Sequence, residues 1–286
     1  MFSLLGELLN LIFPISQECP LCRRSGLPEV CAGCRALLEK QRQAGYCDCC
    51  GRFLQVRPAD KKAGHPKGFG FTAGVDGRSL SLNAGPILCP ECRGGGRPFT
   101  LVRAAGLYEG PLREALHRFK YGGRRSLAVP LASLLWELLN GLEFVQAGLL
   151  LPVPAGVKGA TSSSGAASWV IVPVPLSTGR LRERGFNQAA LLARELSRRL
   201  GVPAAERVLV KSRDTAPQVG LSRREREVNL AGAFAVPDAG VVKGKNILLI
   251  DDVFTTGSTL SAVSSVLLRA GSGQVFGLVL AAGWLT

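Results

Sequence analysis

The sequence has little acidic charge and few aromatic side chains. Asp and Glu number 21 against 35 Lys and Arg, which gives a formal net charge of +14, and Phe, Trp and Tyr make up 6% of the residues. This surplus favours an anionic partner, either nucleic acid or a polyphosphate. The scarcity of rings limits base stacking, so contacts to nucleic acid would be mostly to backbone phosphates and strongly salt-dependent. Phe186 and Tyr121 are the stacking candidates, although core packing is expected of each.

Long apolar runs free of charge are also missing. The most hydrophobic internal stretch, 134–151, is interrupted by Glu137 and Glu143, so we expect no transmembrane segment. The N-terminal 14 residues are apolar but contain Glu7, and they lack a basic leader and a small-residue cleavage site. We therefore expect a soluble, cytoplasmic protein whose first segment is an amphipathic helix packed on a neighbouring element.

Cysteine, by contrast, is abundant and regularly spaced. Eight of the nine cysteines form C-x-x-C pairs, with Cys49 left over: Cys19/Cys22, Cys31/Cys34, Cys47/Cys50 and Cys89/Cys92. Two such turns supply the four thiolates of one tetrahedral metal site. In a cytoplasmic chain this spacing favours two structural Zn²⁺ ions over disulfides or redox chemistry. The simplest arrangement joins the first pair to the second and the third to the fourth, and a crossed arrangement stays open.

Two biased segments suggest how the 286 residues divide. Residues 52–88 are rich in Gly and Lys, residues 151–168 are rich in small side chains, and we read both as inserts. We expect an N-terminal helix and double zinc-ribbon domain over 1–98 and a second domain over 99–286.

The second domain alternates strand and helix patterns. Strands are expected over 101–108, 169–174, 207–210, 232–236, 247–250 and 274–281, and helices over 111–120, 126–140, 188–200 and 260–270. This alternation is typical of an α/β fold with a parallel sheet and flanking helices.

The stretch 246–260, NILLIDDVFTTGSTL, organises this domain. Its short apolar run suits a strand buried on both faces, and it ends on Asp251 and Asp252. A turn of small residues then opens a helix: Thr255, Thr256, Gly257, Ser258 and Thr259. Beyond the carboxyl end of a parallel strand, a helix N-terminus favours phosphate. Two carboxylates beside it suit sugar hydroxyls or Mg²⁺, so the unit predicts a phosphorylated sugar.

A loop of about twenty residues, 211–231, joins two of the short strands. It carries five basic side chains: Lys211, Arg213, Arg223, Arg224 and Arg226. A basic flap of this kind would stabilise the charge that develops on a pyrophosphate leaving group. Because Glu225 and Glu227 interleave, a solvated, partly helical charge run is the alternative.

The 246–260 stretch resembles the phosphoribosyl pyrophosphate (PRPP) motif of type I phosphoribosyltransferases. With the paired cysteines, FKYGG at 119–123, VPVP at 172–175, RGFNQ at 184–188, and Thr215 with Gln218, the whole chain looks like a ComF-family competence protein. The resemblance implies a type I phosphoribosyltransferase-like parallel sheet, preceded by a small Cys-rich zinc-ribbon domain.

It further implies how PRPP would be held. Asp251 and Asp252 would face the ribose with Mg²⁺, and residues 255–259 would bind the 5′-phosphate. Pyrophosphate would lie near Ser177 and Arg180. From the basic flap we add Lys211 as a binding residue and Arg213 as a catalytic one. Members of the family are implicated in single-stranded DNA uptake, so single-stranded DNA and uptake-machinery proteins are the expected partners. The alternative is a nucleotide-salvage phosphoribosyltransferase acting on a purine or pyrimidine base, although we find no acceptor-base signature.

Overall fold

The structure is a computed structural model, and it describes residues 18–26, 29–54, 86–95, 97–140, 168–213, 225, 229–230 and 232–285. The predicted N-terminal helix, most of both predicted inserts and the middle of the 211–231 loop lie outside the described residues. Within the described part, no helix has the length and apolar character that crossing a bilayer requires.

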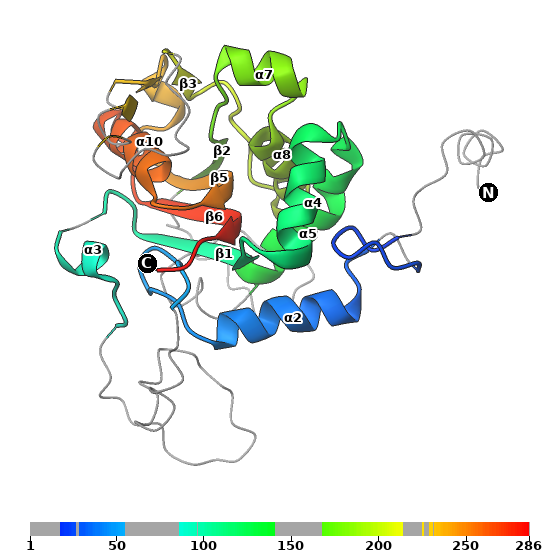
Figure 1. Cartoon of the computed structure of the whole chain (residues 1–286). Coiled ribbons are helices and arrows are strands. Elements are labelled where there is room, and N and C mark those ends of the chain that lie inside the picture. Colours follow the sequence, from blue (N-terminus) through cyan, green and yellow to red (C-terminus); the bar gives the residue numbers. More distant parts are fainter. Residues whose placement is uncertain are drawn as a thin grey trace.

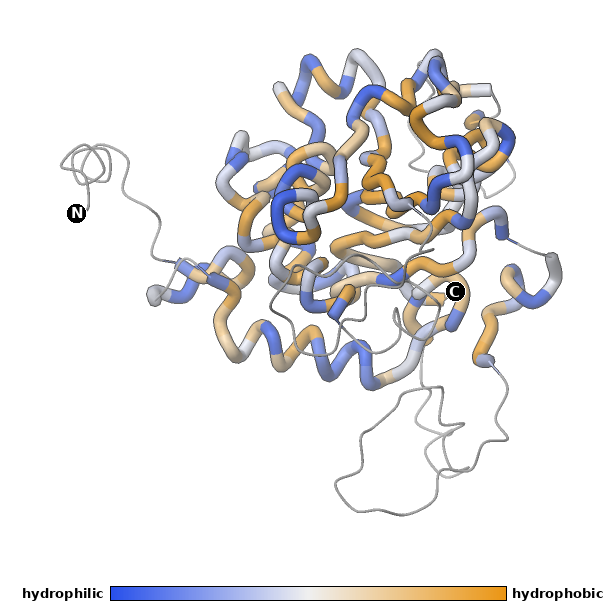
Figure 2. The backbone as a smooth tube through the Cα atoms, turned by 180° about the vertical axis from the view of Figure 1, so that it is seen from behind, coloured by the Kyte–Doolittle hydropathy of each residue, from blue (hydrophilic) through white to orange (hydrophobic). Residues whose placement is uncertain are grey.

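A four-stranded parallel sheet forms the centre of the molecule (Figure 1). The order is β1-β6-β5-β2, with β1 at Leu101–Leu107, β2 at Trp169–Pro173, β5 at Asn246–Phe254 and β6 at Val275–Ala282. All of β6 is buried, and β5 is buried from Ile247 to Ile250. Figure 2 shows these strands as apolar segments inside the fold. The parallel sheet predicted from the alternating pattern is confirmed.

Helices cover both faces of the sheet. On one face lie α4 (Gly110–Tyr121), α5 (Ala128–Leu139) and α8 (Gln188–Leu200), whose apolar sides share one hydrophobic cluster with the strands. On the other face, α10 (Ser258–Arg269) packs in a second cluster. Figure 1 shows these two groups of helices on opposite sides of the strands.

The cysteine-rich segment packs on the same two faces. Cys19 and Cys34, with α2 (Ala32–Gln43), belong to the cluster of α4 and α5, whereas Cys47, Cys50 and Cys89 belong to the cluster of α10. A short helix, α3 (Pro90–Arg93), follows the last of these cysteines. The segment therefore contributes to the core on both sides of the sheet, and the proposed domain boundary at residue 98 stays a prediction.

Two expectations for the second domain were wrong in detail. The short strands β3 (Val210–Lys211) and β4 (Phe234–Ala235) are shorter than predicted, and they pair antiparallel with each other instead of extending the parallel sheet. A long return loop allows this, since β4 can fold straight back on β3. In addition, α7 (Thr178–Arg184) was not predicted. The 3₁₀ turns Arg125–Leu127 (η2) and Ala239–Val241 (η3) complete the fold.

Candidate functional site

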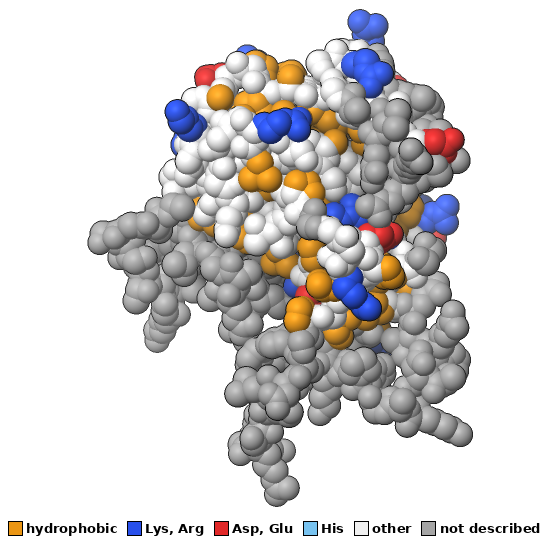
Figure 3. Space-filling view, turned by 90° about the vertical axis from the view of Figure 1, so that its left-hand side faces the viewer, with side chains coloured by type: hydrophobic (Ala, Val, Ile, Leu, Met, Phe, Trp, Pro, Cys, Tyr) orange, Lys and Arg blue, Asp and Glu red, His pale blue; other side chains and the backbone are white. Residues whose placement is uncertain are grey.

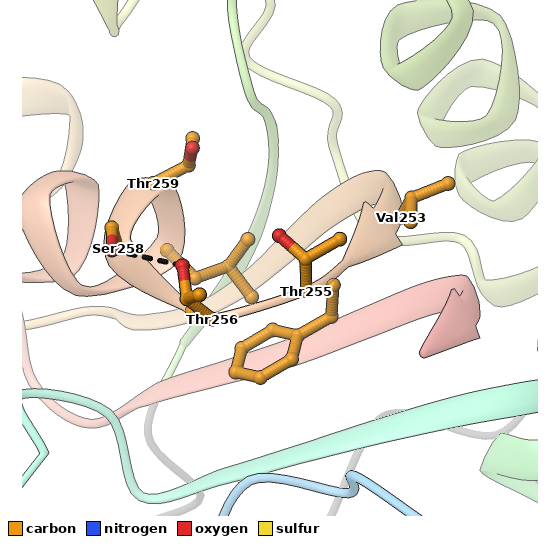
Figure 4. A pocket seen from close by; sticks show the side chains of 8 residues that line it. Val253, Thr255, Thr256, Ser258 and Thr259 are labelled. Atoms are coloured by element: carbon orange, nitrogen blue, oxygen red, sulfur yellow. Dashed lines mark hydrogen bonds between the residues drawn. The ribbon is translucent and has the colours of Figure 1, made fainter. Parts of the chain in front are cut away.

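The phosphate loop, residues 255–259, lies where β5 ends and α10 begins. Gly257 has φ +79°, and a Cβ there would come within 2.4 Å of the Phe254 ring, so this position requires glycine. The hydroxyls of Thr256 and Ser258 share a hydrogen bond at 3.0 Å beside the hollow that the loop encloses (Figure 4). The backbone N–H groups of a helix N-terminus and these hydroxyls together suit a phosphate.

Arg97 supports this loop from the cysteine-rich side. Its Nη2 donates to the carbonyl oxygen of Thr256 at 3.2 Å, and its Nη1 donates to Ser261 Oγ at 3.2 Å. Its Nε is buried without a hydrogen-bond partner among the described residues. Sequence reasoning missed Arg97, because it stands in a Gly-rich stretch that reads as a spacer.

The acid pair, Asp251 and Asp252, lies at the carboxyl end of β5 as predicted. Burial and the neighbouring charge of Asp252 raise the pKa of Asp251 to about 7, although the backbone N–H of Asp252, Lys120 and Arg184 oppose this rise. Asp252 forms an ion pair with Lys120, Oδ1 to Nζ, at 3.0 Å, and both side chains are 14% exposed. Two adjacent carboxylates, partly exposed and held by one lysine, can meet hydroxyls or a cation.

Lys120 and Arg184 were not predicted as site residues. Arg184 donates from Nη2 to the Tyr121 hydroxyl at 3.3 Å and from Nη1 to Gln188 Oε1 at 3.3 Å. Gln188 in turn donates to the carbonyl oxygen of Phe119 at 3.3 Å. These bonds join the end of α4 to α7 and α8 next to the acid pair. The sequence signal was present, because Lys120 and Arg184 fall in the FKYGG and RGFNQ stretches.

The other predicted ligands of PRPP lie on two elements. Ser177 caps α7 and accepts a hydrogen bond from the backbone N–H of Arg180 at 3.4 Å. This turn follows β2, the sheet neighbour of β5, so it opens at the same edge as the acid pair. Lys211 and Arg213 lie instead on the β3–β4 ribbon, where Lys211 stands 5.8 Å from the Phe234 ring and Arg213 donates to the carbonyl oxygen of Asn229.

The eight paired cysteines form two groups, each able to hold a metal ion. In each group the four sulfur atoms lie within 4.8 Å of one another: Cys19, Cys22, Cys31 and Cys34 in the first, and Cys47, Cys50, Cys89 and Cys92 in the second. This confirms the simplest pairing. The Sγ–Sγ distances Cys19–Cys34, Cys22–Cys31 and Cys50–Cys89 are 3.9, 3.7 and 3.8 Å. A tetrahedral Zn–S bond of about 2.3 Å gives an edge of about 3.8 Å, whereas a disulfide would need about 2 Å.

Local hydrogen bonds lower the pKa of one cysteine in each group, which favours its thiolate form. The side-chain bond from Cys50 lowers the pKa of Cys47 to about 4, against the opposing effect of burial, and the backbone N–H of Cys89 donates to its sulfur at 3.3 Å. Burial raises the pKa of Cys19, but backbone N–H groups, that of Cys31 first, outweigh it and lower the value to about 6. Thiolates are the form that binds metal, so both groups fit Zn²⁺.

Comparison with known proteins gives four findings. Residues 187–283 match the family described as the phosphoribosyl transferase domain. The chain is 30% identical over 254 residues to the DNA utilization protein YhgH of Salmonella typhi, covering 87% of this chain and 95% of that protein. It is also 40% identical over 111 residues to Competence protein F of Haemophilus influenzae, covering 38% of this chain and 48% of that one. A solved allosteric regulatory enzyme of purine biosynthesis aligns at 19% identity over 57% of this chain and 29% of that one, with a TM-score of 0.34.

Proposed function

Because the chain belongs to the ComF family of phosphoribosyltransferase-like proteins, we propose that it binds PRPP with Mg²⁺ at the carboxyl end of β5 and acts in DNA uptake by binding single-stranded DNA. The names of the relatives, a DNA utilization protein and a competence protein, support the DNA role. The observation that carries the PRPP site is the placing of the acid pair directly before the phosphate loop.

Each part of PRPP has a group to meet it. The 5′-phosphate suits the phosphate loop, and the ribose hydroxyls suit Asp251 and Asp252, with Mg²⁺ neutralising the polyphosphate. The pyrophosphate would extend toward the turn at Ser177 and Arg180, on the adjacent strand. For Lys211 and Arg213 to reach it, the β3–β4 ribbon would have to close over the site as a flap.

Catalysis, if it accompanies binding, would rest on orientation and charge. Displacement at the anomeric carbon builds oxocarbenium character, which the carboxylate of Asp251 or Asp252 stabilises, while basic groups receive the pyrophosphate. A nucleotide-salvage phosphoribosyltransferase is the second candidate, and the match to the phosphoribosyl transferase domain favours it. Formation of a nucleotide from PRPP and a free base would identify that activity.

The two cysteine groups complete the proposal. Each would hold one structural Zn²⁺, since four thiolates leave no open position for a substrate. Reduced cysteines of this kind fit the cytoplasm, where the protein would meet incoming DNA and the proteins of the uptake machinery.

Titration calorimetry with PRPP and Mg²⁺ tests the site. We expect the wild-type protein to bind and the double variant Asp251→Asn/Asp252→Asn to lose binding, because the ribose and cation contacts are removed. Asp238→Asn is the matched control, because this carboxylate caps the η3 turn, which precedes the amino end of β5, whereas the acid pair lies toward the carboxyl end, and it should bind as the wild type does. No binding by the wild type, or equal binding by the double variant, would overturn the PRPP proposal.

A further inference from the structure

An exposed aromatic ring stands among arginines next to the acid pair. Tyr121, the last residue of α4, is 54% exposed, although a core position was expected for it. The other stacking candidate, Phe186, is 7% exposed and packs on Phe119 with ring centroids 5.8 Å apart. Of the two rings, only that of Tyr121 is therefore open to a ligand.

Two neighbouring side chains hold this ring in place. The Arg184 guanidinium lies 5.1 Å from the ring centre and donates to the hydroxyl, and the His117 ring is 4.8 Å away. These two contacts fix the orientation of the ring. Tyr121 as a whole is still 54% exposed, so a base can contact the part of the ring that these neighbours leave open without first ordering the side chain.

Cations gather around Tyr121. We define the Tyr121 patch as Lys120, Tyr121, Arg124, Arg125 and Arg184. Arg125 donates to the carbonyl oxygen of Gly185 at 2.7 Å, which brings the turn after α4 against the end of α7.

Acidic residues are scarce in the segments that form the Tyr121 patch. The sequence has no Asp or Glu from Ala115 to Trp136, and only Glu183 from Pro175 to Arg194. By contrast, the face with α10 and the β3–β4 ribbon carries its basic side chains at separated places (Figure 3). An exposed ring flanked by arginines on acid-poor segments matches single-stranded nucleic acid, in which bases are free to stack and phosphates lie close by.

We propose that the Tyr121 patch binds single-stranded DNA, with one base stacked on Tyr121 and adjacent phosphates on Arg124 and Arg125. This rests on the DNA-binding half of the proposed function and gives it a location. The strand passes beside the PRPP site, because Lys120 bridges the patch to Asp252 at 3.0 Å. The stacking platform is nevertheless separate from the phosphate loop, so the two ligands can be tested independently.

Fluorescence anisotropy with a labelled oligothymidylate at low salt tests the platform. We expect Tyr121→Ala to weaken binding about tenfold, as loss of one stacked base does, and Tyr121→Phe to keep most of the affinity. Trp284→Ala is the matched control, since Trp284 is also exposed, at 37%, but contacts Glu109. Wild-type affinity in Tyr121→Ala, or an equal loss in Trp284→Ala, would overturn the proposal.

The charges are tested by the salt dependence of the same binding. The double variant Arg124→Gln/Arg125→Gln should bind more weakly and reduce the slope of log K against log salt by about 1 to 2. Arg269→Gln, an exposed arginine at the end of α10, should leave the slope unchanged. An unchanged slope in the double variant would overturn the placing of phosphates on this patch.

PRPP titrations separate this proposal from the wider one. Arg124→Gln/Arg125→Gln should bind PRPP with Mg²⁺ as the wild type does, because neither arginine is part of the proposed PRPP site, and loss of PRPP binding there would overturn the separation of the two sites. If the wild type binds no single-stranded DNA at low salt, the DNA half of the proposed function fails together with this inference. If it binds but Tyr121→Ala binds equally, only this inference fails.

Discussion

The charge on Asp251 suits the proposed site but lowers the stability of the fold. Its carboxylate is surrounded by protein and lies next to Asp252, so ionising it costs free energy that the unfolded chain does not bear. A site for ribose hydroxyls or a cation needs that charge. Under the proposed function, Mg²⁺ bound with PRPP would offset this cost.

We predict that Asp251→Asn stabilises the protein at high pH. The pKa of Asp251 is raised from 3.8 to about 7 in the fold, so the folded state binds the proton more tightly than the unfolded chain. The penalty is absent below about pH 4, grows between pH 4 and 7, and is complete above pH 7. At pH 8 the free energy of unfolding should rise by about 1–3 kcal/mol in Asp251→Asn, with little change at pH 4. Urea denaturation at both values measures this, and a less stable variant at pH 8 would contradict it.

Gly257 combines two constraints that can be separated. Gly257→Ala adds both the cost of a positive φ and a clash with the Phe254 ring, and we predict a loss of about 2–4 kcal/mol in the free energy of unfolding. Gly232→Ala is the control, because Gly232 has φ +68° but nothing within 4 Å of an added Cβ. It should lose only about 1 kcal/mol. Equal losses would show that the Phe254 contact does not constrain the loop.

Two sets of hydrogen bonds connect the segments around the second cysteine group to the phosphate loop. Arg97, which follows α3, binds the carbonyl oxygen of Thr256, and the backbone N–H of Phe53 binds the carbonyl oxygen of Gly283 at 3.3 Å. Gly283 in turn donates to the carbonyl oxygen of Phe254, the residue before the loop, at 2.9 Å. The first group contacts α4 instead, where Arg118 donates to the carbonyl oxygen of Pro20 at 2.6 Å.

We predict that the two metal groups affect PRPP binding differently. Cys92→Ser should lower the zinc content from two ions per chain toward one and weaken PRPP binding several-fold, because the support of the phosphate loop loosens. Cys22→Ser, the matched change in the first group, should lower the zinc content equally and leave PRPP binding within about twofold. Metal analysis and calorimetry measure both. A wild-type content well below two ions, or equal losses of affinity, would contradict the prediction.

The elements that sequence reasoning found are those whose pattern is local. The apolar run of β5, the small-residue turn after it and the stop of α10 before Gly271 lie within one stretch, so their spacing was sufficient. By contrast, α7 has seven residues and no apolar stripe, and only the cap at Ser177 and Gly185, with φ +73°, marks it. The ion pair of Lys120 with Asp252 joins residues far apart in the chain, and no local pattern reports such a pair.

At the scale of the whole molecule, the net charge of +14 predicts a steep salt dependence. If single-stranded DNA contacts several basic side chains, raising the salt from 50 to 200 mM should weaken binding at least tenfold through counterion release. PRPP binding is confined to one small site and should change less over this range. Anisotropy and calorimetry across the salt series give both slopes. A flat response for DNA would remove the electrostatic basis of the proposed DNA binding.

The strand order has a consequence for how the protein is made. β1 is synthesised early, yet its neighbour in the sheet is β6, the last described strand, and Phe53 bonds to residues 283 and 285 just beyond it. On the ribosome, both cysteine groups can load metal while β1 still has no strand to pair with. A nascent chain stopped before β6 therefore exposes the apolar side of β1 to chaperones and proteases. Insertion of β6 between β1 and β5 completes the sheet. Only then can Gly283, just after β6, donate its hydrogen bond to the carbonyl oxygen of Phe254 beside the phosphate loop.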